Sequence, residues 1–251
     1  MNKKITTIVV SSLAAAAFVN IAYSEGAHWD YVGEHGPSDW GKIDPASKPC
    51  SIGKRQSPID INSKNIKANK SLPSLEFSYM TAPLKILNNG HTIQMNYPQG
   101  SKVTIGSNRY ELLQFHFHTP SEHAINGKRT PLEVHFVNKN TDGLAVVGVL
   151  FKEGQKNNAI DAMFNNLPNK TGEVSIDKET MNPIELIPKN KNYYTYPGSL
   201  TTPPCSEIVT WYVVKDQIEA SADQIKKFKK LFPMNARPLQ SLSQRIVEEK
   251  E

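Results

Sequence analysis

Gln114-Phe115-His116-Phe117-His118 and Glu133-Val134-His135-Phe136-Val137 are the two stretches of the sequence that decide the fold. Polar and apolar residues alternate through the first with the period of two that is typical of a half-buried β-strand. Successive side chains on a strand point to opposite faces, so His116 and His118 share one face, ~6.6 Å apart, and the phenylalanines turn toward a core. The second stretch places His135 in the same way. Two neighbouring strands lie ~4.8 Å apart, so the pattern predicts three imidazoles side by side.

These three imidazoles form a candidate metal site. Histidines on adjacent strands can converge on one ion at ~2.0–2.1 Å per bond, and three neutral nitrogens leave the fourth position of a zinc ion open, as in catalytic sites. A metal-bound imidazole usually donates its other N–H to a fixed acceptor, and Gln114 and Glu133 each lie two residues from one of the histidines. For a His-x-His pair alone, the alternative is two half-buried polar side chains without a metal. The full pattern predicts one Zn²⁺ per chain but names no substrate.

The rest of the chain is rich in strand signals and turns. The 17 prolines and 14 glycines favour a β-rich fold with short connections. Helices are predicted at 158–166 and at 222–232, the second ended by Pro233. The segment 26–54 has no clear period and is expected to wrap the surface. Strands are predicted at 75–79, 84–87, 92–97, 102–105, 109–118, 132–138, 144–152 and 208–214.

The first 24 residues are typical of a secretory signal peptide. Lys3 and Lys4 precede an apolar run, and Ala22 and Ser24 supply the small residues that a signal peptidase reads. The run of ~15 apolar residues is shorter than the ~20 that a membrane-spanning helix needs, which disfavours an uncleaved anchor. We therefore expect a signal peptide at 1–24 and one domain at 25–251. This predicts an exported protein, periplasmic or secreted in a bacterium, with no membrane span in the mature chain.

The charge of the chain is mild. The full sequence carries +5, and removal of Lys3 and Lys4 leaves +3 for residues 25–251. The densest basic run, 226–230, interleaves lysines with apolar residues, as on the wet side of an amphipathic helix. No nucleic-acid partner is expected.

Cys50 and Cys205 are the two cysteines of the chain. An even number in an exported protein predicts a disulfide bond. Two metal thiolates are the alternative. The three histidines already form a ligand set without them, so the disulfide is favoured.

Several longer motifs closely resemble the alpha-class carbonic anhydrases. The two histidine stretches belong to them, and the match extends from about Trp29 to Arg245. The other motifs are Gln56-Ser57-Pro58-Ile59-Asp60-Ile61, Asn88-Asn89-Gly90-His91, Ser121-Glu122-His123 and Gly198-Ser199-Leu200-Thr201-Thr202-Pro203-Pro204-Cys205. The resemblance implies a mainly β (α+β) fold, with a large twisted, mostly antiparallel central sheet, short peripheral helices, and cis peptide bonds before Pro58 and Pro204. The run Thr119-Pro120-Ser121-Glu122-His123 and the signal sequence resemble the bacterial branch.

The resemblance also implies a reaction, the reversible hydration of carbon dioxide to bicarbonate and a proton. It assigns the zinc ligands to His116, His118 and His135, with zinc hydroxide as the nucleophile. Thr201 would accept a hydrogen bond from this hydroxide and pass its own proton to Glu122. Thr202 would help to hold bicarbonate. A bond from Cys50 to Cys205 would tether the loop that carries both threonines.

The remaining implied roles concern the substrate and the proton. A neutral substrate needs an apolar wall, for which the resemblance implies Val137, Val146, Leu200 and Trp211. His91 would be the proton shuttle, since an unperturbed pKa of ~6.5 suits that task. Tyr31, Asn89 and Gln94 would order the intervening water. A zinc esterase and a binding module without catalysis are the rival functions, and ester hydrolysis is compatible as a side activity. The oligomeric state stays open, with a homodimer as one option.

Overall fold

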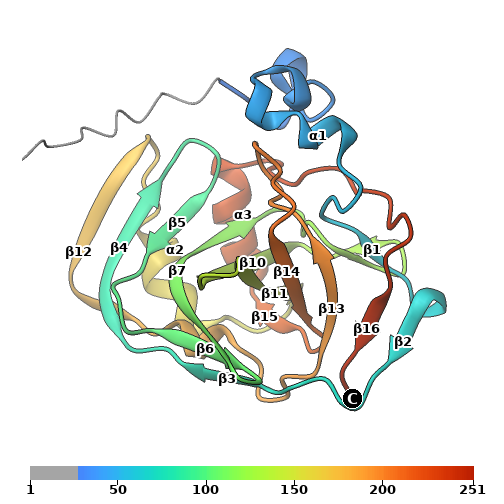
Figure 1. Ribbon diagram of the computed structural model, residues 1–251. Helices are drawn as coiled ribbons and strands as arrows, with labels where there is room; N and C mark the ends of the chain where they lie inside the picture. Colours follow the sequence, from blue (N-terminus) through green and yellow to red (C-terminus); the bar gives the residue numbers. More distant parts are fainter. Residues whose placement is uncertain (1–27) are drawn as a thin grey trace, which may run out of the picture.

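The computed structural model describes residues 28–251, so the predicted signal peptide lies outside the described residues. One large twisted sheet dominates this part of the chain (Figure 1), in the order β12-β4-β5-β7-β10-β11-β14-β13-β16-β2. Three further strands belong to the same sheet outside this order: β6 pairs with β7, β3 pairs with β6, and β15 pairs with β11. The strands are β2 (Ile66–Ala68), β3 (Leu75–Ser78), β4 (Ala82–Asn88), β5 (Ile93–Asn96), β6 (Lys102–Ile105), β7 (Asn108–His118), β10 (Leu132–Lys139), β11 (Leu144–Glu153), β12 (Gly172–Met181), β13 (Tyr193–Gly198), β14 (Val209–Val214), β15 (Ile218–Ala220) and β16 (Val247–Glu249).

The sheet is mixed, with antiparallel pairs in the majority. Its parallel pairs are β11 with β14, β11 with β15, and β16 with β2. A small second sheet joins β1 (Asp60–Ile61), β8 (Ala124–Ile125) and β9 (Lys128–Arg129). The predicted fold class, a large and mostly antiparallel sheet with few short helices, is confirmed.

All eight predicted strands are present, with ends within two residues of the prediction. The two longest strands that the sequence patterns missed are β12 and β13. Nearly every residue of β12 is exposed, because it forms one edge of the sheet, so it lacks an alternating apolar face. β13 ends in Pro197-Gly198, a dipeptide that otherwise indicates a turn.

Two helices cover the face of the sheet opposite the histidines. They are α2 (Asp161–Asn165), preceded by a 3₁₀ turn, and α3 (Ala222–Leu231). Both lie where the sequence predicted helices. Ser221 and Gln224 cap the N-terminus of α3 with a reciprocal capping box. The ring of Phe117 packs against Phe164 and Phe228, with ring centroids 5.2 and 6.0 Å away. The phenylalanines of β7 therefore point into the main core.

The segment before β1 wraps one end of the sheet, as expected (Figure 1). It contains three 3₁₀ turns and the short helix α1 (Pro49–Ile52). Tyr31 and Trp40 are buried there beside the two cysteines, with Trp29 packed against them. The expected cis bonds precede Pro58 and Pro204, and a third precedes Pro120.

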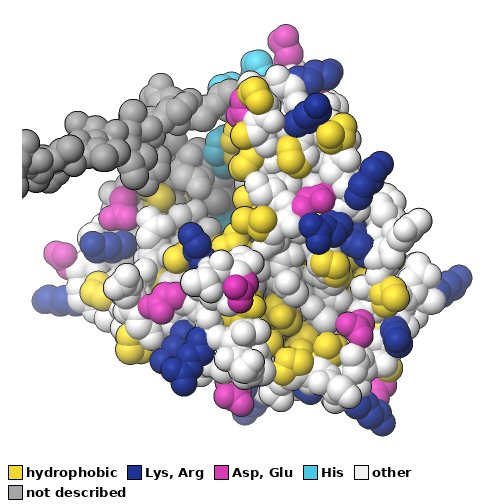
Figure 2. All heavy atoms as spheres, viewed as in Figure 1, with side chains coloured by type: hydrophobic (Ala, Val, Ile, Leu, Met, Phe, Trp, Pro, Cys, Tyr) yellow, Lys and Arg dark blue, Asp and Glu magenta, His cyan; other side chains and the backbone are white. Residues whose placement is uncertain are grey.

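The surface of the described residues carries scattered charge. Figure 2 shows lysine, arginine and acidic side chains interspersed over the visible face. Within residues 28–251, no helix combines the length and the apolar character needed to cross a membrane.

Candidate active site

Strand register brings the three predicted metal ligands together. His135 on β10 lies opposite His116 on β7, and the next pair on the same face of these two strands is Glu133 with His118. Ligand atoms of the three histidines lie within 4.8 Å of one another. His118 and His135 are buried, and His116 is partly buried. The site therefore follows from the pleat of two neighbouring strands.

Each of these histidines donates one ring N–H to a fixed oxygen. Each of these oxygens is an amide, carboxylate or main-chain carbonyl oxygen that can only accept a hydrogen bond, so the bonded nitrogen is the protonated one. The bonds run from His116 Nδ1 to Gln114 Oε1 (2.7 Å), from His118 Nδ1 to the Asn235 carbonyl (2.7 Å) and from His135 Nε2 to Glu133 Oε1 (2.9 Å). The second nitrogens, Nε2 of His116 and His118 and Nδ1 of His135, are left to act as ligands.

The protonation and burial of these groups fit a zinc ion. Burial lowers the pKa of His118 and holds the pKa of His116 well below its usual range, so both rings are neutral, as a ligand must be. His118 Nε2 and Glu122 Oε2 are buried without a hydrogen-bond partner among the described residues. A buried polar atom without a partner is costly, and a cation bound by the imidazoles would satisfy the first of these atoms.

Glu133 accepts hydrogen bonds from two histidine rings and from two main-chain N–H groups. Its Oε1 accepts from His135 Nε2 and from His123 Nδ1 (2.8 Å), and its Oε2 accepts from the main-chain N–H groups of Glu122 (2.7 Å) and His123 (2.9 Å). Burial alone would raise the pKa of this carboxyl, but the two histidines hold it well below its usual range. Gly148 leaves room for it, because a Cβ there would lie 2.9 Å from Glu133 Oε1. His123, Glu133 and His135 could also hold a metal by spacing, but they already bond to one another.

Glu122 is buried beside His118 and His135. Its Oε1 accepts from the main-chain N–H of Arg237 (2.8 Å). Its Oε2 lies 3.6 Å from His118 Nε2 and 3.9 Å from His135 Nδ1. The hydrogen bonds of residues 28–251 do not include the expected one from Thr201 to Glu122, so that bond stays a prediction. Oε2 is the oxygen that has capacity for it.

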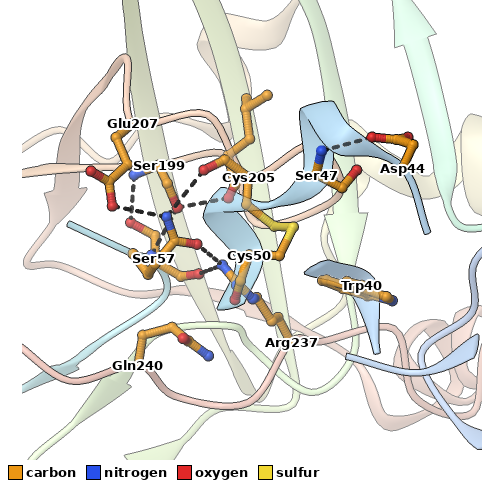
Figure 3. The surroundings of a disulfide bond; sticks show 12 residues. Trp40, Asp44, Ser47, Cys50, Ser57, Ser199, Cys205, Glu207, Arg237 and Gln240 are labelled. Atoms are coloured by element: carbon orange, nitrogen blue, oxygen red, sulfur yellow. Dashed lines mark hydrogen bonds between the residues drawn. A yellow bond between two sulfur atoms is a disulfide. The ribbon is translucent and has the colours of Figure 1, made fainter. Parts of the chain in front are cut away.

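The loop between β13 and β14 carries Thr201 and Thr202. Its backbone folds on itself through bonds from Leu200 N to Ser206 O (3.1 Å) and from Cys205 N to Thr202 O (2.9 Å). Thr201 is buried, whereas Thr202 lines the cleft described below. Cys205 forms the predicted disulfide with Cys50, so the loop is tethered to α1 (Figure 3).

A cleft of about 100 Å³ opens onto the histidines. It is lined by Trp29, Tyr31, Asn89, His91, Thr92, Gln94, His116, His118 and Thr202. The structure thus brings the predicted shuttle and all three predicted water-ordering residues to one cavity. A larger hollow of about 580 Å³ lies between Lys54 and Arg245, but no histidine lines it. The smaller cleft is the candidate active-site cleft, because His116 and His118, two of the three candidate ligands, line it.

His91 sits in this cleft with its ring stacked on Trp29. The ring centroids are 3.7 Å apart and the planes differ by 8°. Partial burial lowers the pKa of His91. Near it, the Asn89 side chain donates to Gln94 Oε1 (3.5 Å), and Gln94 Nε2 donates to Asn96 Oδ1 (2.6 Å).

The predicted apolar wall is continuous. Val137, Val146 and Trp211 lie in one row across β10, β11 and β14, each paired in register with the next. Leu200 packs against the same cluster. The ring of Trp211 lies 4.7 Å from that of His135, so the wall stands next to the candidate metal site.

Asn235 is a residue of the candidate site that the sequence analysis missed. Its main-chain carbonyl accepts from His118, and its side chain accepts from Thr119 N (2.7 Å) and donates to the carbonyls of His91 and Phe117 (3.0 Å each). It therefore fixes a ligand and the shuttle segment together. Since 117 residues separate it from His118, no local motif could have pointed to it.

Comparisons with known proteins point to one family. The family model described as eukaryotic-type carbonic anhydrase matches residues 35–251. A carbonic anhydrase of Nostoc sp. strain PCC 7120 is 38% identical over 245 residues, covering 96% of this chain and 93% of the relative. One of Pectobacterium carotovorum is 38% identical, covering 94% and 98%. The structure of the alpha-carbonic anhydrase from Thermovibrio ammonificans with the inhibitor sulfanilamide is 42% identical, with a TM-score of 0.85, and covers 89% of this chain and 99% of that one.

A carbonic anhydrase from a hydrothermal vent chimney, described as hyperthermostable, is 45% identical at the same TM-score, covering 89% of this chain and 100% of that one. The family is zinc-dependent in general, and the histidine triad is the matching candidate site. The fold, the site and the similarity over nearly the whole chain lead to one conclusion: the protein belongs to the alpha-carbonic anhydrase family and is an enzyme of the lyase class.

Proposed function

We propose that this protein is a zinc enzyme that catalyses the reversible hydration of carbon dioxide. The observation that carries the proposal is the set of three imidazoles, each with one nitrogen committed to a fixed oxygen and the other left as a ligand. His116, His118 and His135 would hold the ion. A bound zinc ion lowers the pKa of a water molecule in its open position and so supplies a nucleophile at neutral pH.

The residues around this position orient the reactants. The Thr201 hydroxyl donates a hydrogen bond to Glu122. Its oxygen can therefore only accept a hydrogen bond on the side of the cleft. This favours one orientation of the attacking group, an effect of positioning. Carbon dioxide rests against Val137, Val146, Leu200 and Trp211, because a neutral apolar molecule is bound by contact and not by charge. Thr202 donates to bicarbonate before the product leaves.

His91 carries the proton out of the cleft. It lines the same cavity as His116, and Tyr31, Asn89 and Gln94 offer the polar groups that order water between them. A lowered pKa makes the protonated ring a better donor to buffer than a histidine in free solution.

A stopped-flow assay of carbon dioxide hydration, with and without a zinc chelator, tests the proposal. We expect fast hydration that chelation abolishes and added zinc restores. Ester cleavage measured on the same preparation should be far slower, as a side activity. Folded, zinc-loaded protein without hydration activity would overturn the proposal, and folded protein that binds no zinc would favour a binding module.

We also propose that residues 1–24 direct export and that residues 25–251 form the mature domain. The disulfide is compatible with an oxidising compartment such as the periplasm. Intact-mass measurement of the exported protein should show a chain that begins at Glu25. A mature chain that keeps Lys3 and Lys4 would contradict cleavage.

A further inference from the structure

Arg237 is a buried cation where three distant parts of the chain meet, and neither the sequence motifs nor the proposed function gives it a role. Its side chain is 1% exposed. Nη1 donates to Gln56 Oε1 and to the Ser57 carbonyl (2.8 Å each), and Nη2 donates to the Cys50 carbonyl (3.0 Å). Figure 3 shows the guanidinium beside Cys50 and Ser57, with the ring of Trp40 alongside, 5.6 Å from Cζ.

Neutral oxygens, not a carboxylate, accept all three of these bonds. Burial lowers the pKa of Arg237 to about 10, so the group keeps its charge at neutral pH. A buried charge is costly unless its hydrogen bonds are well formed. The planar fork of a guanidinium can reach several acceptors at fixed angles, which a lysine ammonium cannot reproduce. The arrangement therefore fixes the position of the backbone of Arg237 as well as its side chain.

The main chain of Arg237 reaches the active site. Its N–H donates to Glu122 Oε1 (2.8 Å) and leaves Oε2 facing His118 and His135. Any shift of this N–H would rotate or displace the carboxylate. One residue thus holds the disulfide segment with its side chain and the carboxylate of Glu122 with its backbone.

The same cluster also reaches the loop of Thr201. Gln56, which accepts from the guanidinium, donates through Nε2 to the Cys205 carbonyl (3.1 Å). The Cys205 N–H in turn donates to the Thr202 carbonyl. The contacts run from Thr202 through Cys205, Gln56 and Arg237 to Glu122. Both partners of the expected Thr201–Glu122 hydrogen bond are therefore attached to one cluster.

We propose that Arg237 is a positioning residue that sets the placement of Glu122 relative to the disulfide-tethered loop of Thr201. The inference rests on the proposed function, because it assigns Glu122 and Thr201 a shared task. Arg237 touches no reactant, and it acts through the carboxylate.

A double-mutant cycle tests this inference. Arg237→Lys keeps the charge but cannot make the three bonds of the fork. We expect it to bind zinc stoichiometrically, because no ligand is touched. Its kcat for carbon dioxide hydration should fall by about 10-fold or more, with little change in KM. A misplacement of 1 Å can lower a rate by ~10²-fold. In a Glu122→Gln background the same substitution should lower kcat less than about 2-fold, because coupled residues are not additive.

Arg245→Lys is the matched control. The guanidinium of Arg245 also makes three hydrogen bonds, in this case to the carbonyls of Leu242, Pro197 and Ser241, but it does not contact Glu122. We expect its kcat to equal that of the wild type. If Arg237→Lys does not fold, Gln56→Ala removes one guanidinium acceptor and the bond to Cys205, and it should give a smaller loss of kcat that again vanishes with Glu122→Gln.

The outcomes separate the inference from the proposed function. An inactive, zinc-loaded wild type would overturn both. With an active wild type, an unchanged kcat in folded Arg237→Lys would overturn the inference alone. So would an equal loss in both backgrounds, since a purely structural role lowers activity regardless of Glu122, or an equal loss in Arg245→Lys.

Discussion

In the candidate active site, one half is carried by strands and the other half by loops, and the two halves are held in place by different interactions. His116, His118 and His135 stand on β7 and β10, where pleat and register alone place them on one face. Glu122 and Thr201 stand on connections outside regular structure. Their positions depend on contacts with residues more than 100 positions away in sequence, as between Glu122 and Arg237.

This difference separates two kinds of failure. Damage to the strand half should remove the metal and leave most of the fold, because the backbone ladder persists without an imidazole. Damage to the loop half should leave the metal and lower the rate or the stability, because it displaces groups that act on the reactants. The expected effects below are ordered from the largest to the smallest.

His116→Ala should abolish zinc binding and hydration activity, since two ligands do not complete the site. Metal analysis of the purified protein and the stopped-flow assay measure both. His28→Ala is the control, because His28 is an exposed histidine outside the candidate metal group. Stoichiometric zinc in the His116 variant would show that the histidines on the strands do not hold the metal as proposed.

Glu133→Gln should weaken zinc affinity by ~10–100-fold, as losses behind a metal ligand typically do. A glutamine cannot accept from both histidines and both backbone amides at once, so His135 loses its fixed orientation. Competition with a chromophoric chelator measures the affinity. An affinity equal to that of the wild type would show that the ligand needs no such support.

His91→Ala should leave zinc content unchanged and slow turnover in dilute buffer by up to about 100-fold, the lower end of what a positioned proton-transfer group contributes. Imidazole buffer should restore part of the rate. Full activity of this variant in weak buffer would show that another group moves the proton.

Cys50→Ser should lower the free energy of unfolding by ~2–5 kcal/mol, because the bond closes a long loop, and it should lower activity together with stability. Zinc should stay bound when the ion is in excess. Denaturant titration and the hydration assay are the measurements. A melting temperature and a turnover rate equal to those of the wild type would show that the disulfide does not support the loop that carries Thr201.

Trp29→Ala should raise the pKa of His91 toward the ordinary value of a histidine. Partial burial lowers this pKa because it disfavours the charged ring, and removal of the stacked indole exposes the imidazole to water. An NMR titration of the His91 ring protons measures the shift. A constant or lower pKa would show that the stacked ring does not cause it.

Prediction from sequence succeeded where local pattern and tertiary environment agree. The strands that bury one face or both carry alternating or continuous apolar residues, and all of these that the patterns marked are present. The exposed edge strand β12 has no such signal, so it was missed. The disulfide was predictable because the chain has two cysteines and therefore one pairing.

The sequence by itself determined the family, through its contiguous motifs, and a candidate ligand set, through the spacing of residues along single strands. The apolar wall was predicted only through the resemblance to the family. Only the tertiary structure decided that the Asn235 carbonyl orients His118, that Gly148 leaves room for Glu133, and that Arg237 joins Glu122 to the disulfide segment. The physical reason is the range of the interactions. The period of a strand depends on residues that are neighbours in the sequence. A backbone carbonyl or a buried arginine bonds to its partners only after distant segments have packed together.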